Sequence, residues 1–508
     1  MDYHNYKNTK RRRRKIKSPE YLSLEMILRK SFMESMKEYF HNCSLAGARQ
    51  MCDPNISAFL RIMWAIVFCV ALGTMCFFLQ YIWSGMLAKP FVVTMESSTY
   101  PISSIDFPAI AVCNINRISK KALAKFAFEV YPDIAYKESL EEVEKVLLNF
   151  GRLINYSYNE SLKNSELYLR LVEKYRFDDQ RIVQIMKMLA PSCEEMILKC
   201  AWEGKVVDCQ KIFSMQRIAN RGHCCTFNYW ALKKNAEIKK QKEPGVIYGL
   251  NVILDPLIDD YAYPLNSLQG FDILIHDSTH FADPNAGRVI HRICEPNMEV
   301  FFELKSTKQI ATQEIRKYST ETRNCLFQNE YSDFFDIKYS YSTCIVFCRI
   351  DSILSLCKCT PYFFAIKALQ KVTKDAPVCT LENLSCLNKY REKFAYLYPV
   401  DAEDLQGLEL EKENSLFCGG CLPDCELTQY FTKSYEIPVK NTQYGEKNLE
   451  DIFVKNINTT NRSLLHIFHP LPSATLDRLD VVYYWFEVLS NIGGFSCVVI
   501  GFSFAAVD

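Results

Sequence analysis

The feature that most constrains this chain is an uncharged apolar run of 21 residues, Ile62–Ile82, which reads IMWAIVFCVALGTMCFFLQYI. Only Thr74 and Gln80 within it are polar. Because about 20 apolar residues span the hydrocarbon core of a bilayer, we predict a transmembrane helix over residues 62–82. A secretory signal peptide would lie nearer the N-terminus and would end in a cleavage site. The alternative that remains is a buried helix in the core of a soluble protein.

A second apolar stretch runs from about Val481 to Val507 and is interrupted by Glu487 and Asn491. It also contains Gly493-Gly494, which is a poor centre for a helix. A helix that faces only lipid would not keep these groups, whereas a helix that lines water can. We therefore predict a second transmembrane helix that lines a pore.

Cysteines and glycosylation sequons indicate that the region between the two apolar stretches lies outside the cell. The chain has 22 cysteines, and 17 of them lie between Cys113 and Cys425. This density is typical of compartments in which disulfides persist. Five Asn-x-Ser/Thr sequons between the apolar stretches favour an N-glycosylated, extracellular face: Asn155, Asn159, Asn383, Asn458 and Asn461.

The charge distribution sets the expected topology. Lys10–Lys17 reads KRRRRKIK, and the positive-inside rule places this cluster, and with it the N-terminus, in the cytoplasm. A nuclear signal is the alternative, but it does not fit an apolar span and extracellular sequons. We expect residues 1–61 inside, a first span at 62–82, a cysteine-rich extracellular domain at 83–480, and a second span at 481–508. Both termini are then cytoplasmic.

The end of the sequence leaves two alternatives for the second span. The sequence stops five residues after Ser503. A straight helix over residues 480–508 would be long enough to cross a bilayer at 1.5 Å per residue. The second span is therefore either complete, or truncated with an inner half that lies beyond Asp508.

Within the extracellular region, hydrophobic periodicity predicts an α+β fold. Residues 120–188 are mostly helical in pattern, as in ESLEEVEKVLLNF and ELYLRLVEKYRF. After Cys224 the segments GVIYGLNVILD, FDILIHD and NMEVFFELKS are typical of strands. Residues 325–425 hold ten cysteines and a helical segment, CIVFCRIDSILSLC, and the strand-like YFTKSYEIPV and RSLLHIFHPL follow. His276-Asp277 is interpreted as a turn at a strand end.

Two cysteine pairs could also bind metal. Cys357-Lys-Cys359 and Cys418-Gly-Gly-Cys421 have spacings that zinc sites use. Disulfides are the better interpretation in an oxidising compartment, where they also staple a subdomain too small for a large core. The sequence contains no GxSxG, HExxH or Walker motif, so we expect neither an enzyme nor a cofactor or metal.

Several motifs, in this order and spacing, resemble the degenerin/epithelial sodium channel superfamily, and most closely its insect pickpocket branch. They are IDFPAIAVCNIN after the first span, CAWEGKVVDCQKIF with GHCCTFN, YSYSTCIVFC with CKCTP, and CGGCLPDCELTQY. The resemblance covers nearly the whole chain. It implies two transmembrane helices that flank a large disulfide-rich ectodomain. That ectodomain would have a β-sheet palm and β-ball with a helical finger at about 120–223, a thumb at about 325–425, and a knuckle.

The resemblance also implies disulfide pairs that spacing alone does not give. Three cysteines remain outside these pairs, Cys193, Cys225 and Cys294, so at least one is free or pairs with another chain. The implied pairs are Cys113–Cys224, Cys200–Cys209, Cys325–Cys425, Cys344–Cys421, Cys348–Cys418, Cys357–Cys386 and Cys359–Cys379.

For the pore, the resemblance implies that Gly501, Phe502 and Ser503 form the selectivity segment. A Gly-x-Ser tripeptide can direct carbonyls and a hydroxyl at a cation that is losing its water. Small residues also serve plain helix packing, which is the alternative interpretation of this tripeptide. Cys497 stands in the region where the family binds pore blockers, at a site where many members have glycine.

Gating residues are carried over in the same way. Ser490 matches the family position where a small residue lets three helices approach in the closed state, just before Gly493 and Gly494. Before the first span, Ala46-Gly47 stands where the family has His-Gly, so the glycine is kept and the imidazole is absent.

The sequence therefore predicts a subunit of a trimeric, sodium-selective, voltage-independent cation channel of the plasma membrane. An extracellular stimulus acting on the ectodomain would gate it. Its partners would be sodium ions, the bilayer and the same or related subunits. The alternative, which Ala46 and the short C-terminal segment keep open, is a non-conducting or accessory subunit that modulates related channels. Basic and acidic residues nearly balance, at 60 and 59, so nucleic acid is not an expected partner.

One other class of channel is weighed and set aside. An ATP-gated, two-span trimer would also have a cysteine-rich ectodomain, but it would need an extracellular cluster of Lys and Arg for the triphosphate. It would also lack the Gly-x-Ser tripeptide at Gly501–Ser503.

Overall fold

The computed structural model divides the chain into two compact units, which are described separately. It describes residues 24–42, 45, 47–53, 55–88, 90–134, 139–158, 166–175, 179–229, 237–330, 338–364, 376–398, 407, 409–439, 453 and 459–501. The first unit joins residues 1–92 to residues 481–508, and the second comprises residues 93–480. We call them the helical unit and the sheet unit.

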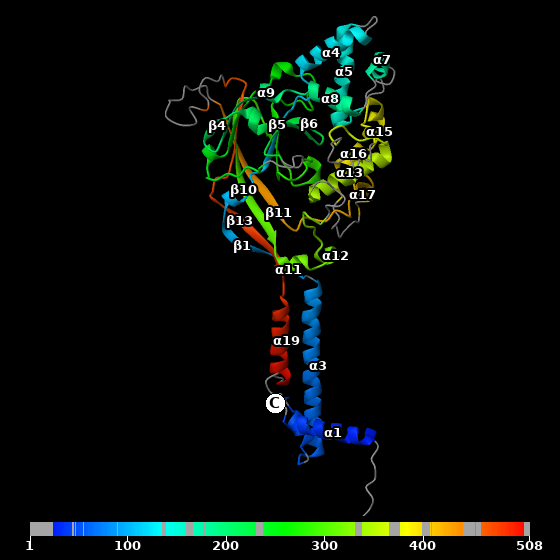
Figure 1. The fold of residues 1–508 in the computed structure, drawn as a ribbon, viewed down its shortest axis with the longest axis vertical. Helices are drawn as coiled ribbons and strands as arrows, with labels where there is room; N and C mark the ends of the chain where they lie inside the picture. Colours follow the sequence, from blue (N-terminus) through cyan, green and yellow to red (C-terminus); the bar gives the residue numbers. More distant parts are fainter. Residues whose placement is uncertain are drawn as a thin grey trace, which may run out of the picture. The chain divides into compact units, whose positions relative to one another are not determined.

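The described residues of the helical unit form four helices (Figure 1): α1 (Leu24–Asn42), α2 (Ala48–Cys52), α3 (Ala58–Ala88) and α19 (Trp485–Ile500). Residues Ala58–Gly85 of α3 are long and apolar enough to cross a membrane, and none of the most apolar window is buried within the structure. The buried helix of a soluble core is thereby excluded for α3. The helix predicted over 62–82 is present and is longer than expected.

The second apolar helix begins later than predicted. Strand β13 (Ser473–Val481) continues to Val481, and the Val482 N–H donates to the Pro90 carbonyl at 2.9 Å. A short bend at residues 482–483 then leads into α19. α19 is 16 residues long, shorter than the 481–508 span expected from the sequence. Residues 502–508 lie outside the described part of the chain.

The sheet unit contains two sheets. The larger runs in the order β1-β13-β10-β12-β7-β3-β4, and β11 also pairs with β10. The smaller runs β5-β6-β2-β8-β9. The remaining strand bounds are β1 (Phe91–Pro101), β2 (Ala109–Asn114), β3 (Ile197–Trp202), β4 (Lys205–Val207), β5 (Phe213–Ile218), β6 (Gly222–Phe227), β7 (Leu250–Leu254), β8 (Phe271–His276), β9 (Ile290–Cys294), β10 (Met298–Ala311), β11 (Leu427–Pro438) and β12 (Ser463–Phe468).

Strand β10 is the spine of the larger sheet. It pairs antiparallel with β11 from Met298↔Pro438 to Gln309↔Leu427. Its other edge pairs in parallel first with β12 and then with β13. Along β10 the side chains alternate with a period of two, so that Val300, Phe302 and Leu304 are buried.

A single apolar layer joins the two sheets. It is formed by side chains of β2, β6 and β8 from the smaller sheet and of β3, β7, β10 and β12 from the larger one. Aromatic rings lie at its centre: Phe107 contacts Trp202 edge-on at 4.8 Å and Phe227 at 6.0 Å between ring centroids. Burying large aromatic side chains of this kind is the main source of stability for such a layer.

Helices cluster beside the sheets (Figure 1) and share one core. The predicted finger contributes buried residues such as Leu147 and Leu171, and the predicted thumb contributes Ile350 and Phe363. The bounds are α4 (Lys120–Ile134), α5 (Leu140–Leu148), α6 (Arg152–Asn155), α7 (Glu166–Tyr175), α8 (Asp179–Leu189), α9 (Cys193–Met196), α10 (Cys209–Ile212), α11 (Gln313–Arg316), α12 (Thr320–Arg323), α13 (Tyr341–Cys357), α15 (Leu384–Lys389), α16 (Arg391–Ala395) and α17 (Glu409–Glu413).

The sequence placed most of these elements but misjudged one boundary. The strand-like segments after Cys224 form β7, β8, β10, β11 and β12, and His276 does end a strand. Residues 197–223, assigned to the helical finger, instead hold β3 to β5 and the start of β6. These strands are short, and ILKCAW and KVV show no alternation of apolar and polar residues, so periodicity could not reveal them.

The disulfides cross-link residues of the helical cluster and of the sheets, all within the sheet unit. The structure contains all seven pairs that the resemblance implies. An eighth, Cys193–Cys225, joins α9 to β6 and accounts for two of the three cysteines left over. Cys357, Cys359, Cys418 and Cys421 are all in disulfides, so they are not zinc ligands. No group of three potential metal ligands occurs among the described residues.

Cys294 is the cysteine of the sheet unit that is outside these disulfides, and its thiol is a test of the disulfide assignment. It is fully buried in β9, and burial raises its pKa to about 12. The thiolate is the reactive form of cysteine. We therefore expect Cys294 to resist alkylation at about pH 8 in the folded, detergent-solubilised chain, and to react after unfolding without reductant. Mass spectrometry of the Cys294 peptide measures both states.

The exposed Cys52 is the internal control and should be alkylated without unfolding. Rapid labelling of Cys294 in the folded chain would contradict the assignment. So would a disulfide that links Cys294 to Cys193 or Cys225.

Candidate ion pathway

Helix α19 carries most of the predicted pore and gating residues, and its two ends are well defined. The backbone N–H of Tyr484 donates to the Glu487 carboxylate at 3.0 Å, so this acidic residue caps the helix start. At the other end Gly501 has φ of 69°, in the left-handed region that glycine favours, and its N–H donates to the Cys497 carbonyl at 3.0 Å. Phe502 and Ser503 lie outside the described residues.

In the sequence, Glu487 was interpreted as a polar group of a helix that lines water. Its role as a cap at the helix start gives it a local structural reason instead. Gly493 and Gly494 do not break α19, which stays helical through both. Ser496 is buried, and its hydroxyl donates to the Ile492 carbonyl at 2.7 Å. Glu487 and Ser496 of α19 therefore have local explanations.

One face of α19 packs on α3. Phe495 lies 5.6 Å from Phe78 of α3 between ring centroids. A hollow of about 300 Å³ between the two helices is lined by Leu79, Gln80, Ile82, Trp83, Val488, Asn491 and Ile492. On α19 these contacts fall at positions 488, 491, 492 and 495, the three- and four-residue spacing of a single helix face.

The predicted gating residues lie on the opposite face. At 3.6 residues per turn, Ser490, Gly493, Gly494 and Cys497 fall on the side of α19 turned away from positions 488, 491, 492 and 495. Ser490 and Cys497 are exposed. A Cβ added at Gly493 or Gly494 would meet none of the described atoms within 4 Å. Within one chain this small-residue face therefore has no partner among the described residues.

The glycine before α3 has a packing role that the sequence did not reveal. Gly47 has φ of 83°, and a Cβ there would lie 3.0 Å from the Trp64 ring of α3. Its carbonyl accepts from the Met51 N–H at 3.1 Å, which starts α2. Glycine is thus required both for the backbone conformation and for the close approach to Trp64. Ala46 lies outside the described residues.

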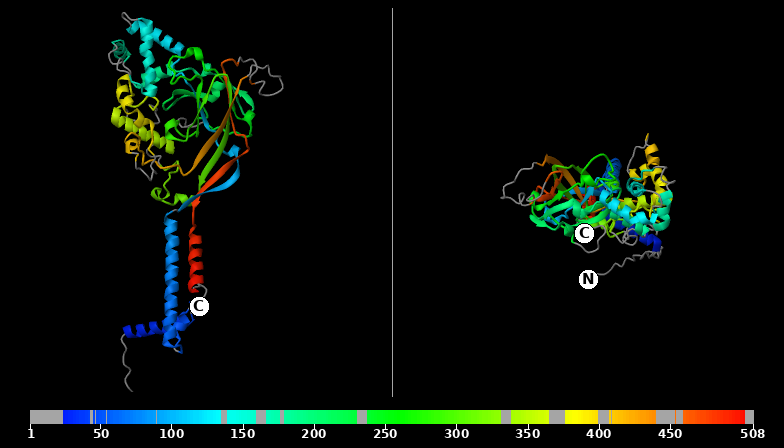
Figure 2. Two further views of the ribbon diagram at one scale, coloured as in Figure 1. Left: turned by 180° about the vertical axis from the view of Figure 1, so that it is seen from behind. Right: turned by 90° about the horizontal axis from the view of Figure 1, so that it is seen from above.

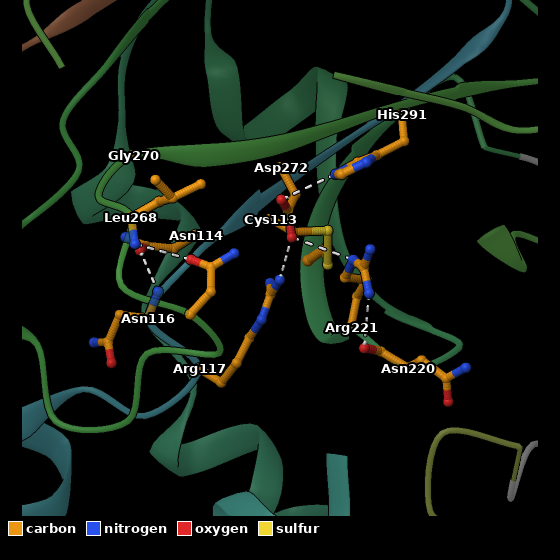
Figure 3. A network of polar contacts seen from close by, with 12 residues as sticks. Cys113, Asn114, Asn116, Arg117, Asn220, Arg221, Leu268, Gly270, Asp272 and His291 are labelled. Carbon is orange, nitrogen blue, oxygen red and sulfur yellow. Dashed lines mark hydrogen bonds and ion pairs between the residues drawn. A yellow bond between two sulfur atoms is a disulfide. The ribbon is translucent and has the colours of Figure 1, made fainter. Parts of the chain in front are cut away.

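In the sheet unit, a buried carboxylate contacts two arginine side chains and a histidine ring (Figure 3). Asp272 of β8 lies 2.6 Å from Arg117 and 3.2 Å from Arg221, and the His291 ring lies 3.0 Å from its other oxygen. The Cys113–Cys224 disulfide is beside it (Figure 3). The cluster joins β2, β6, β8 and β9 at the place where the chain leaves for α4.

The ionisation of this cluster follows from burial and charge. Burial raises the pKa of Asp272, but the hydrogen bond with His291 and the charges of Arg117 and Arg221 outweigh it, so the net pKa is lowered. Burial lowers the pKa of Arg117 to about 10, partly offset by the attraction of Asp272. Both groups are therefore charged at neutral pH, and each stabilises the charged form of the other.

Two asparagines of the IDFPAIAVCNIN motif fix the start of the helical cluster. The side-chain amide of Asn114 donates to the Pro256 carbonyl at 2.8 Å, and that of Asn116 donates to the Asp260 carbonyl at 2.9 Å. The Asn116 side-chain oxygen also accepts from the Tyr263 N–H at 2.9 Å, and the Asn116 backbone N–H donates to the Asn114 side-chain oxygen at 2.9 Å (Figure 3). The motif therefore positions the strand-to-helix junction in the sheet unit, not the ion path.

The sequons differ in how free their side chains are. Asn461 is exposed, whereas Asn155 is half-buried and accepts from the Tyr263 hydroxyl at 3.2 Å. The Asn383 side-chain oxygen accepts from the Thr380 N–H at 2.9 Å. Asn159 and Asn458 lie outside the described residues. Glycosylation at the five sites remains a prediction.

Comparison with known proteins settles the family. A family model described as the amiloride-sensitive sodium channel matches residues 39–507. The chain belongs to the amiloride-sensitive sodium channel family. This confirms the resemblance found in the sequence, and the family is one of ion channels, not of enzymes.

The individual relatives are distant but extend over most of the chain. Sodium channel protein Nach of Drosophila ananassae is 23% identical over 498 residues, which cover 96% of this chain and 88% of that protein. Pickpocket protein 28 of Drosophila melanogaster is 21% identical, with 94% and 78% covered. The human epithelial sodium channel subunit beta is 22% identical over 254 residues, 49% of this chain and 34% of that protein.

The buried Asp272 cluster yields a stability test. Asp272→Asn would leave Arg117 and Arg221 buried without a counter-charge, and we expect it to lower the free energy of unfolding by about 3–5 kcal/mol. The exposed pair Glu166–Arg170 gives a matched control, because Glu166→Gln should change stability by less than about 0.5 kcal/mol. Thermal unfolding of the purified chain compares the two variants.

The same cluster predicts the direction of a pH effect. Because the folded-state pKa of Asp272 is lowered, its stabilisation is present above the ordinary aspartate pKa of about 3.9 and is lost as the pH falls through the lowered value. The Asp272→Asn variant should therefore lose less stability on acidification than the wild-type chain. An equal loss would contradict the role assigned to this carboxylate.

Proposed function

We propose that this chain is a subunit of a trimeric, sodium-selective cation channel of the plasma membrane, and that α19 lines its ion path. The observation that carries the proposal is the small-residue face of α19, formed by Ser490, Gly493, Gly494 and Cys497. It is opposite the face that packs on α3 and has no partner among the described residues. Membership of a sodium channel family supports sodium as the permeant ion.

The small-residue face supports a closed state in which several α19 helices meet. Small side chains let helix backbones approach closely in a bilayer. Three such faces around one axis would leave a narrow path bordered by the residue-490 side chains and by the glycines. Below them, the left-handed turn at Gly501 ends the helix. A Gly-x-Ser tripeptide can direct backbone carbonyls and a hydroxyl at a cation, which supports Gly501, Phe502 and Ser503 as the selectivity segment.

The proposed topology places both termini in the cytoplasm and the sheet unit outside. The basic cluster Lys10–Lys17 before α3, the eight disulfides and the sequons between the apolar helices support it. The order of the chain supports a route for gating. β1 follows α3 and β13 precedes α19, and these two strands are neighbours in the larger sheet. A stimulus that shifts this sheet would act on both helices through two adjacent strands.

A second candidate function rests on Ala46. The His-Gly pair of the family is replaced here by Ala46-Gly47, so the imidazole that would act as donor and acceptor is missing. On this basis the chain could instead be a non-conducting or accessory subunit that modulates related channel subunits.

Enlarging Ser490 tests the proposed role of α19. If three small-residue faces meet in the closed state, Ser490→Trp should hold them apart and give a sustained sodium current without a stimulus. This current is measured by two-electrode recording from cells that express the chain. The baseline is the current that remains when sodium is replaced by a large organic cation. We expect several-fold more resting current than in the wild-type chain.

Leu489→Trp is the matched control, because Leu489 is exposed and lies outside the small-residue face. It should leave the resting current unchanged. Current from Ser490→Trp only when a related subunit is co-expressed would favour the accessory role. An increase of equal size from both variants would contradict a specific closed-state contact at Ser490.

A further inference from the structure

Helix α1 has two chemically different sides. In its second half, large apolar residues occupy one side, and charged residues occupy the other at 100° per residue. The apolar side consists of Phe32, Met33, Met36, Tyr39 and Phe40, and the charged side of Lys30, Glu34, Lys37 and Glu38. This is the pattern of a helix that needs an apolar surface along one side and water along the other.

The described part of the chain leaves much of that apolar side uncovered. Phe32 is 64% exposed, Met33 is 55% exposed and Tyr39 is 42% exposed. Leu28, one turn earlier on the same side as Phe32, is 61% exposed. A row of large exposed apolar side chains of this kind indicates a contact with a membrane or a partner.

The position of α1 in the helical unit favours the membrane. α2 contacts both α1 and α3, so α1 is held at the end of α3 where that helix begins. Within this unit α1 runs across the direction of α3, as both side views show (Figures 1 and 2). Because α3 crosses the bilayer, a helix directed across it at its start lies along the bilayer surface.

The cations that fit an anionic leaflet lie mainly before α1, because α1 itself has three basic and three acidic residues. Lys30 and Lys37 border the apolar side, where their long side chains can reach lipid headgroups. The sequence before α1 contains the seven cations of Lys10–Lys17. Clusters of this size next to an amphipathic helix are attracted to the negative surface of the cytoplasmic leaflet.

We propose that α1 is an interfacial helix whose apolar side is inserted between the headgroups of the cytoplasmic leaflet, with anionic lipid as its partner. The bilayer surface then anchors the segment that leads into Gly47, whose backbone packs on Trp64 of α3. The proposal does not depend on whether the chain conducts ions.

Depth-dependent quenching tests this placement. The full chain is reconstituted in nanodiscs of phosphatidylcholine and phosphatidylserine, with a genetically encoded environment-sensitive fluorophore at Phe32 or, as the matched control, at the exposed Glu34 on the opposite side. A nitroxide on the fifth acyl carbon of the lipid should quench position 32 several-fold more than position 34. The pair Tyr39 and Glu38 repeats the comparison at a second place.

Other outcomes would overturn the proposal. Equal quenching at Phe32 and Glu34 would mean that α1 does not lie with its apolar side in the bilayer. Blue-shifted emission at Phe32 without lipid quenching would mean that a protein surface, from another subunit or a partner, covers it. Quenching that is unchanged when phosphatidylserine is omitted would overturn the role of anionic lipid.

Discussion

The bilayer is the constraint on which the helical unit depends. α3 is apolar over 28 residues, and its most apolar window has no residue buried within the structure, so its side chains must find lipid or another helix. One face of α19 packs on α3, through Val488, Asn491 and Ile492. The opposite face, with Ser490, Gly493 and Gly494, has no neighbour within the described chain. The two faces have different chemistry because they serve different neighbours. One packs within the subunit, and the other would, in the proposed trimer, meet copies of the same helix.

The sheet unit is held together by a different set of interactions. Eight disulfides, the aromatic layer around Phe107 and the buried Asp272 cluster each join elements that are far apart in sequence. The helices predicted to form the finger and the thumb share one core, so they cannot be treated as independent subdomains. Under the proposed function, a unit cross-linked in this way would carry a displacement to β1 and β13, the two strands that continue into the apolar helices.

The sequence predicted the apolar helix α3, the long strands and the disulfide-rich helical segment, because each has strong local periodicity. It did not predict β3 to β5, which are short; β3 (ILKCAW) and β4 (KVV) also lack any alternation of apolar and polar residues. The seven disulfides came from family resemblance, and Cys193–Cys225 was left open because spacing cannot choose among three cysteines. From the sequence, Ser490, Gly494 and Cys497 were each assigned a role by resemblance, without any indication that they lie on one face of a helix. The packing of α19 on α3 showed that this face has no partner among the described residues. Likewise, the need for glycine at position 47 became apparent only from the position of Trp64.

The central claim is that the small-residue face of α19 borders the path of the ion. Cysteine accessibility during current recording tests it most directly, on a Cys497→Ser background so that the native thiol does not react. The account predicts that a charged methanethiosulfonate reagent applied to open channels blocks sodium current in Ser490→Cys and Gly494→Cys, but not in Val488→Cys, which faces α3. Block of Val488→Cys with no effect at positions 490 and 494 would contradict it.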